Sequence, residues 1–227
     1  MTVDVRLVSL GALAAHPLRG EKGDVRPGHL TTSLVISDDR RILVDPSLPG
    51  RVLTERLDER VGLKPADITD VFLTSFRPIG RRGLDLFDEA RWLISERERE
   101  SVGVALVEGF QKAEEAGDRD LEETLREEIG LLQRCEAAPD TLAERVNLFP
   151  LPGVTPGFAG LLIAHAQWTM LVASDAVPSI EHLEAGQVLA NVTDIEAAQE
   201  SLGEVVEIAD FIIAGRDGLI PNPLRRW

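Results

Sequence analysis

A short loop behind an apolar segment carries several side chains that can do chemistry. Residues 70–74 have the length and apolar character of a buried strand, and the loop begins directly after them. This loop contains the hydroxyl of Ser75 and the guanidinium groups of Arg77, Arg81 and Arg82. Polar groups delivered from a strand end into a loop are where α/β proteins place their chemistry. The guanidinium groups suit recognition of a phosphate or a carboxylate.

Ser75 is not expected to act as a nucleophile. A serine nucleophile needs a neighbouring base, and no histidine lies near Ser75 in the sequence. The histidines of the chain are expected at the surface or in structural hydrogen bonds; they are His16, His29, His165 and His182. We therefore expect Ser75 to fill space as a small polar residue.

Alternating and periodic apolar residues predict an α/β chain without linkers or internal repeats. Strands are predicted at 3–9, 30–37, 41–44, 70–74, 91–94, 146–149, 159–165, 168–173 and 210–214. Helices are predicted at 51–61, 96–116, 118–136, 180–185 and 194–207, with a short helix or turn at 85–90 and a short helix from 139. The chain is predicted to be one domain, residues 1–227, with a charge-rich helical insertion at 96–145.

The order of these elements, together with five loops, resembles the metallo-β-lactamase superfamily. The loop described above keeps Thr74, Gly83 and Leu84 at the places of T, G and L in that family's sequence T-H-x-H-x-D-H-x-G-G-L. Segments 42–48, 151–157, 173–176 and 213–217 resemble the family's Asp-ended strand, T-P-G-H-T-P-G loop, G-D-A segment and final P-G-H-D. The resemblance implies an α/β fold, an αββα four-layer sandwich, for most of the chain outside 96–145. It also implies metal-dependent hydrolysis as the family's activity.

The resemblance assigns the family's metal-ligand positions, and most of them carry no ligand here. The positions are Ser75, Arg77, Ile79, Gly80, Val154, Asp175 and Arg216. Only Asp175 binds a metal well, because aliphatic side chains and glycine offer no lone pair and arginine is a permanent cation without an acceptor. We therefore expect no metal and no other cofactor, with zinc as the alternative. A mononuclear site formed by His29, Asp45 and Asp175 is the alternative geometry.

The same resemblance places Arg77 and Arg216 beside Asp175. An unpaired buried carboxylate is costly, so we predict that one of these arginines replaces the metal cation in an ion pair. The competing arrangement has both arginines in solvent. His29 and Asp45 are expected at the rim of this pocket.

The resemblance also gathers four arginines at one mouth of an otherwise acidic protein: Arg77, Arg81, Arg82 and Arg216. Such a pocket is predicted to bind a small anionic ligand with a phosphate or carboxylate group. The competing interpretation is a set of local salt bridges to Asp85, Asp88 and Asp217.

Composition argues against several kinds of partner. The formal net charge of −15 disfavours nucleic acid and anionic membrane surfaces, which need a basic face. Cys135 is the only cysteine, so no intrachain disulfide or thiolate zinc cluster can form. The first apolar stretch is interrupted by Asp4 and Arg6, unlike a signal peptide, and no window approaches the roughly 20 apolar residues of a membrane span. A cytoplasmic location is the expectation.

The sequence therefore predicts a non-catalytic protein of this fold, without metal, that acts by binding or by assembly. A stripe at helical spacing in the insertion, formed by Leu121, Leu125, Ile129 and Leu132, predicts packing. The insertion is accordingly the predicted homodimer interface. The alternative function is a hydrolase of an ester, a lactone or a phosphoester that uses an altered or mononuclear metal site.

Overall fold

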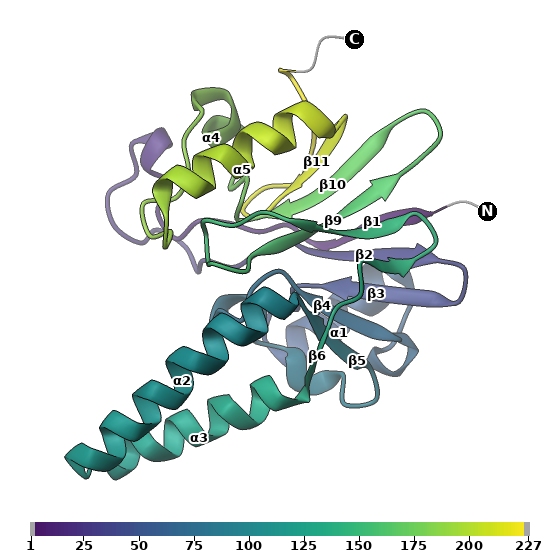
Figure 1. The fold of residues 1–227 in the computed structure, drawn as a ribbon. Helices are drawn as coiled ribbons and strands as arrows, with labels where there is room; N and C mark the ends of the chain where they lie inside the picture. Colours follow the sequence, from purple (N-terminus) through teal and green to yellow (C-terminus); the bar gives the residue numbers. More distant parts are fainter. Residues whose placement is uncertain (1–2, 225–227) are drawn as a thin grey trace.

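Two mixed sheets of six strands each lie at the centre of the structure, a computed structural model that describes residues 3–224 (Figure 1). The first sheet has the order β1-β2-β3-β4-β5-β6. Its strands are β1 (Asp4–Ser9), β2 (Thr32–Ser37), β3 (Arg40–Val44), β4 (Asp70–Leu73), β5 (Arg91–Ile94) and β6 (Cys135–Ala137). The second sheet has the order β12-β11-β10-β9-β8-β7. Its strands are β7 (Thr141–Ala143), β8 (Val146–Pro150), β9 (Ala159–Ala164), β10 (Thr169–Ser174), β11 (Phe211–Ala214) and β12 (Leu219–Pro221).

Helices cover the outer faces of both sheets and complete four layers. Helix α1 (Gly50–Val61) lies on the first sheet, whereas α4 (Ile180–Ala185) and α5 (Ile195–Ile208) lie on the second (Figure 1). Helix α1 begins after Pro49 and ends at Gly62, whose φ of 68° is the left-handed conformation that glycine adopts without strain. The layer order is the predicted αββα sandwich. No helix among residues 3–224 is long and apolar enough to cross a membrane.

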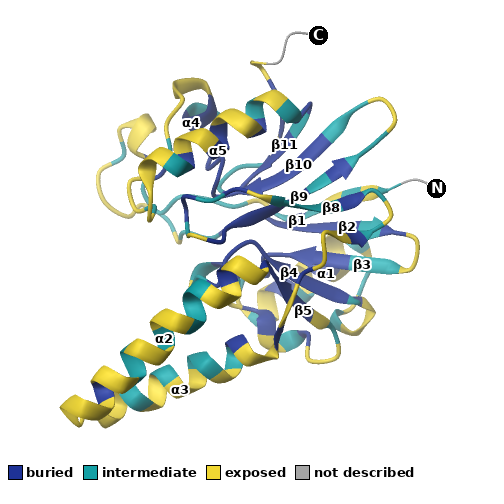
Figure 2. Ribbon diagram, viewed as in Figure 1, coloured by how far each residue is buried: buried dark blue, intermediate teal, exposed yellow. Residues whose placement is uncertain are grey.

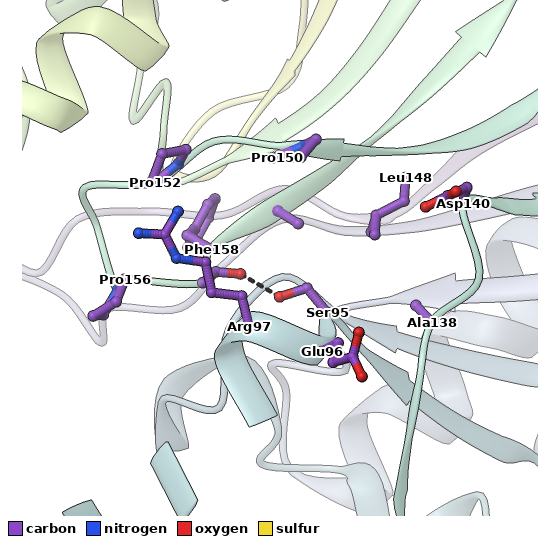
Figure 3. Close-up of a pocket in the computed structure, with 12 residues that line it drawn as sticks. Ser95, Glu96, Arg97, Ala138, Asp140, Leu148, Pro150, Pro152, Pro156 and Phe158 are labelled. Atoms are coloured by element: carbon purple, nitrogen blue, oxygen red, sulfur yellow. Dashed lines mark hydrogen bonds between the residues drawn. The ribbon is translucent and has the colours of Figure 1, made fainter. Parts of the chain in front are cut away.

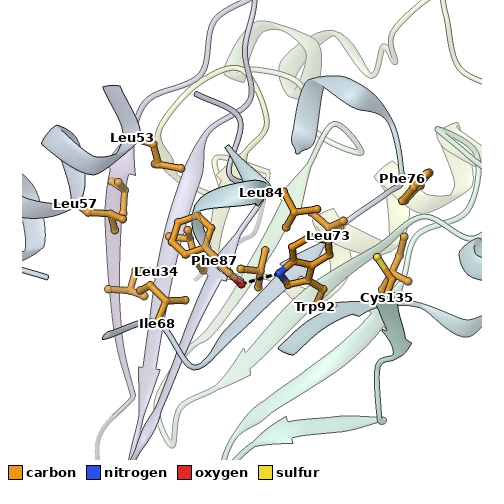
Figure 4. Close-up of a cluster of buried hydrophobic side chains, with 14 of the residues drawn as sticks. Leu34, Leu53, Leu57, Ile68, Leu73, Phe76, Leu84, Phe87, Trp92 and Cys135 are labelled. Atoms are coloured by element: carbon orange, nitrogen blue, oxygen red, sulfur yellow. Dashed lines mark hydrogen bonds between the residues drawn. The ribbon is translucent and has the colours of Figure 1, made fainter. Parts of the chain in front are cut away.

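Alternation along the central strands explains why both faces of the first sheet are covered. Leu34 and Leu43 point to the outer layer, where Leu53 and Leu57 of α1 join them. Their neighbours Val35 and Ile42 belong instead to the cluster between the two sheets. The outer cluster also holds a buried tryptophan, Trp92, whose indole Nε1 donates to the carbonyl of Phe87 at 2.9 Å (Figure 4).

A helical hairpin leaves the sandwich between β5 and β6. It consists of α2 (Glu96–Ala116) and α3 (Arg119–Arg134), and it stands away from the sheets (Figure 1). Ser95 caps α2 by accepting a hydrogen bond from the Glu98 amide at 3.1 Å, and Asp118 caps α3 in the same way. Gly117 between them has a φ of 68°.

Several expected boundaries are wrong, all of them near the hairpin exit or the chain end. The helix expected over 118–136 ends at Arg134, because residues 135–137 pair in parallel with β5 as strand β6. The short helix expected from 139 is strand β7, which pairs with β8. The helical segment is therefore 96–134 rather than 96–145. Strand β12 was not expected. The short helix or turn expected over 85–90 is present, as a 3-10 helix at Leu84–Leu86 followed by a turn at 88–89.

Candidate functional site

Asp175 and Arg216 follow neighbouring parallel strands, so the fold brings them to the same sheet edge. The Arg216 Nε donates to Oδ1 of Asp175 at 2.7 Å, and Nη2 donates to Oδ2 at 2.7 Å. Gly215 makes this approach possible, because a Cβ at that position would lie 2.6 Å from the Asp175 nitrogen. The ion pair therefore depends on the parallel pairing of β10 with β11 and on the absence of a side chain at Gly215.

Arg77 reaches the same carboxylate from the other sheet. It lies in the loop after β4, and its Nη2 donates to Oδ2 of Asp175. The Asp175 side chain is 1% exposed, that of Arg216 is 6% exposed and that of Arg77 is 22% exposed. The predicted pairing is therefore present, and it involves both arginines rather than one. Charge-assisted bonds of this kind are stronger than neutral ones, and the bidentate pair also fixes geometry.

A second carboxylate, Asp45, lies buried in a cluster of hydroxyl groups and not at a pocket rim as expected. It is fully buried. Its Oδ1 accepts from the Thr74 amide at 3.0 Å, and its Oδ2 accepts from the hydroxyls of Thr74 and Ser174, each at 2.8 Å. Burial raises the pKa of Asp45 to about 6, against the lowering effect of these hydrogen bonds.

The backbone around Asp45 is strained on both sides of the sandwich. Asp45 has a φ of 48° and Ser174 a φ of 46°. Residues other than glycine rarely adopt this left-handed conformation, which costs free energy and concentrates at functional sites. Two strained residues other than glycine thus lie within one hydrogen-bonded cluster, which makes the cluster a candidate functional site.

The remaining positions assigned by the resemblance offer the site no side-chain donor or acceptor of a metal-binding kind. Val154 is 2% exposed and packs in the apolar cluster beneath α4 and α5. Ile79 contributes its carbonyl, which accepts from the Ser47 hydroxyl at 2.7 Å. A Cβ on Gly80 would lie 3.4 Å from Oδ1 of Asp45, so this glycine sits against the buried carboxylate. Ser75 is 3% exposed.

Arg81 and Arg82 have partners different from those of Arg77 and Arg216. Arg81 forms an ion pair with Glu128 of α3, donates to the Phe76 carbonyl at 2.9 Å, and lies over the Phe76 ring. Arg82 donates to the Gly28 carbonyl at 2.9 Å. The acids that the competing interpretation named are not their partners. Asp88 pairs with Arg134, and Asp217 accepts from the Ile180 amide.

The alternative mononuclear trio does not come together. Both ring nitrogens of His29 contact carbonyl oxygens, those of Pro27 at 3.3 Å and Leu10 at 2.8 Å. Asp45 binds hydroxyl groups and Asp175 binds arginines, as described above. Within residues 3–224, no three His, Cys, Asp or Glu side chains are grouped so that they could hold a metal ion.

Sequence reasoning missed Glu98, which lies in the first turn of α2. This side chain is fully buried. It accepts hydrogen bonds from the Phe76 amide at 3.0 Å, the Thr155 hydroxyl at 2.7 Å and the Gly157 amide at 3.2 Å. Glu98 therefore ties the arginine-bearing loop to the loop that contains Val154. A glutamate in a first helical turn is common, so nothing in the sequence singles it out.

Two buried histidines form another unexpected cluster. The Ser179 hydroxyl lies 3.0 Å from Nε2 of His16 and 2.9 Å from Nδ1 of His182. Glu181 also contacts Ser179 at 2.8 Å and lies 3.3 Å from Nε2 of His16. Burial, and then the charge of His16, lowers the pKa of His182. This cluster holds the loop after β1 against the segment that follows Asp175.

A cavity of about 300 Å³ lies beside the site, between the start of α2, strand β8 and the loop 150–158 (Figure 3). Its wall is formed mainly by Phe158 and three prolines of this loop, with Arg97 and Glu96 on the helix side. The Ser95 hydroxyl donates to the Gly157 carbonyl at its base. Asp175 does not line this cavity, so the ion-pair cluster and the cavity are separate features.

No protein-family model and no curated protein sequence matches this chain. Solved structures match it in shape. A Thermotoga maritima protein provisionally assigned as a metallo-beta-lactamase covers 97% of this chain and 100% of its own, with a TM-score of 0.68 and 18% identity. A variant of AiiA from B. thuringiensis, solved with N-decanoyl-L-homoserine at its active site, covers 96% and 94%, with a TM-score of 0.67 and 19% identity. AidC, a dizinc quorum-quenching lactonase, covers 86% and 73%, with a TM-score of 0.63 and 22% identity.

The residues of this chain do not fit a dinuclear zinc centre. Such a centre needs several imidazoles and carboxylates with free lone pairs. The one carboxylate at the assigned positions, Asp175, accepts hydrogen bonds from guanidinium groups on both of its oxygens. The similarity to these structures therefore extends to the path of the backbone.

Proposed function

Since the chain has the metallo-β-lactamase fold, we propose that it uses this fold for binding and not for metal-dependent hydrolysis. The observation that carries the proposal is the ion pair of Asp175 with Arg216 and Arg77. A divalent cation at Asp175 would have to displace two guanidinium groups, and their charge would repel it. The arginines thus supply the positive charge that balances this carboxylate.

The proposed ligand is a small anion with a carboxylate or phosphate group, bound at Arg77. This side chain is 22% exposed, and the carboxylate of Asp175 engages its Nη2 alone. No other hydrogen bond of its guanidinium group is formed with residues 3–224, and the ion cluster holds two cations for one carboxylate. Guanidinium donors bind phosphate and carboxylate well.

Ligand binding is tested by thermal unfolding in increasing inorganic phosphate. We expect phosphate to raise the Tm of the wild-type protein, because a ligand of the folded state stabilises it by mass action. The Arg77→Met variant should lose this response, whereas Arg56→Met, on the exposed face of α1, should keep it. An equal response of all three proteins would contradict binding at Arg77.

The second candidate is a hydrolase of an ester, lactone or phosphoester with an altered metal site. The similar structures favour it, because they include a dizinc lactonase and a protein solved with an acyl-homoserine at its active site. Metal analysis of protein purified without chelators separates the two candidates. We expect well below one equivalent of zinc, iron or manganese, and no lactone turnover that depends on Asp175. A stoichiometric metal that is lost in Asp175→Ala, together with such turnover, would establish the hydrolase instead.

A further inference from the structure

The hairpin of α2 and α3 exposes an apolar surface that the rest of the chain does not cover. Val104 is 61% exposed and Val107 is 47% exposed. A groove of about 520 Å³ runs beside them between the two helices, with Gly103, Ile129 and Leu132 in its wall. The hairpin carries exposed residues along most of its length (Figure 2). A contiguous exposed apolar patch of this kind marks an interaction site.

We propose that the occupant of this surface is the hairpin of a second copy of this chain, packed antiparallel across a two-fold axis. A two-fold interface requires one patch that fits itself. Here the projecting valines and the groove lie on the same surface of the hairpin. Gly103 leaves room for an incoming side chain, because the nearest atom to a Cβ at that position would be 3.7 Å away, on Leu132.

Charge selects the antiparallel direction. The tip of the hairpin is acidic, with exposed Glu114, Glu115, Asp118 and Asp120. The base carries Arg97 and Arg99 between Glu96 and Glu100, all four exposed, so these charges balance, and neither arginine side chain forms a hydrogen bond or an ion pair with residues 3–224. Antiparallel packing brings each acidic tip to a base whose charges balance and whose two arginines can pair with it, whereas parallel packing would place the two acidic tips together.

The dimensions of the hairpin are sufficient for a stable dimer. Helix α2 has 21 residues, which corresponds to a length of about 30 Å. A face of that length and two helices wide buries roughly 600 Å² per copy, near the lower limit of stable interfaces. Pairing Arg99 with Glu115 of the second copy places Val107 at the two-fold axis. The inference does not depend on the ligand proposed above.

The oligomeric state of the full chain tests the proposal. Light scattering after size-exclusion chromatography should give twice the chain mass of 24.8 kDa. Val104→Glu should restore the single-chain mass, whereas the matched control Val52→Glu, at an exposed valine of α1, should leave the dimer intact. A monomeric wild type at 100 μM, or a dimer unchanged by Val104→Glu, would overturn the proposal. If the chain is monomeric, this surface would instead be available to a helix of a different protein.

Cross-linking tests the direction of packing independently of folding yield. Under oxidation, Val107→Cys should form a disulfide-linked dimer, because the same residue of both copies meets at the axis. Gly117→Cys, at the tip, should not cross-link. Cys135 is buried, so the wild type serves as the background. Cross-linking at Gly117→Cys as well as at Val107→Cys would show parallel packing and contradict the proposed arrangement.

Discussion

Arg216 and Asp175 form a two-point ion pair across the ends of neighbouring parallel strands, with both nitrogen-to-oxygen distances at 2.7 Å. Arg77 joins the same carboxylate from the opposite sheet. The cluster therefore links the two sheets at one edge through charged groups, in a region where the exposed fraction of Asp175 is only 1%. Its integrity should contribute measurably to the stability of the fold.

Asp175→Asn should lower the free energy of unfolding by about 3 kcal/mol, because it leaves two guanidinium groups without their counter-charge. Urea denaturation measures the loss. Arg216→Met should cost more than Arg77→Met, because Arg216 is less exposed and makes two of the three bonds. Arg6→Met, which breaks an exposed pair with Asp4, is the control and should cost less than about 1 kcal/mol. Equal, small losses for all of these variants would contradict the role of the cluster.

Asp45 should make stability depend on pH in the direction opposite to an ordinary paired carboxylate. Burial raises its pKa from 3.8 to about 6, so the folded state favours the protonated form. Its contribution to stability is therefore complete below pH 3.8 and is lost as the pH rises through 6. The shift corresponds to a loss on the order of 3 kcal/mol. In urea denaturation, the difference in unfolding free energy between wild type and Asp45→Asn should fall by this amount from about pH 4 to pH 7. A difference independent of pH would contradict it.

His182 should destabilise the fold in mildly acidic solution. Burial and the neighbouring His16 lower its pKa below 6.5, whereas the charges of Glu181 and Asp175 act in the opposite direction. Because the folded state favours the neutral imidazole, the contribution of His182 to stability is present above pH 6.5 and is lost as the pH falls below it. His182→Asn should flatten this decline in denaturation experiments between about pH 7 and pH 5. His165→Asn, between β9 and β10, should leave it unchanged, and an identical decline in both variants would assign the effect elsewhere.

Glu98→Ala should be among the most damaging single substitutions of the hairpin. It leaves buried donors on Phe76, Thr155 and Gly157 without an acceptor, at an expected cost of about 3 kcal/mol or more. Glu100→Ala, at an exposed position of the same helix, should change stability by less than about 0.5 kcal/mol. Hydrogen exchange gives a second measurement, because the amides of Phe76 and Gly157 should lose protection in Glu98→Ala alone. Retained protection would show that other contacts hold the two loops.

The order of the elements could be predicted from local signals, and the ion pair could be predicted because the family resemblance placed Arg77 and Arg216 beside Asp175. The strand before Thr74, the loop glycines and the pattern of short motifs identify the αββα sandwich, which the similar solved structures confirm. The positions that the resemblance assigns to metal ligands carry no histidine, so a buried Asp175 needed another cation to balance its charge. Two of these positions carry arginine.

Features that depend on contacts between distant segments could not be predicted. Strands β6, β7 and β12 have three residues each, too few for a periodic pattern, and only pairing with a neighbour defines them. His16 meets Ser179, and through it His182, across 163 residues of sequence. Asp45 was expected at a rim because segment 42–48 resembles the family's Asp-ended strand, whereas the hydroxyl groups that enclose it come from two other segments.

The first turn of helix α2 is anchored in the sandwich, whereas its last turn lies in solvent. Glu98 anchors the first turn of α2 to both loops beside the ion cluster. Ser95 holds the same end of the helix through its hydrogen bond to Gly157. A partner bound at the tip of the hairpin would exert a force on α2, whose first turn contacts the loop of Arg77. A shift of α2 at its first turn would therefore act directly on the loop that carries Arg77, a partner of Asp175.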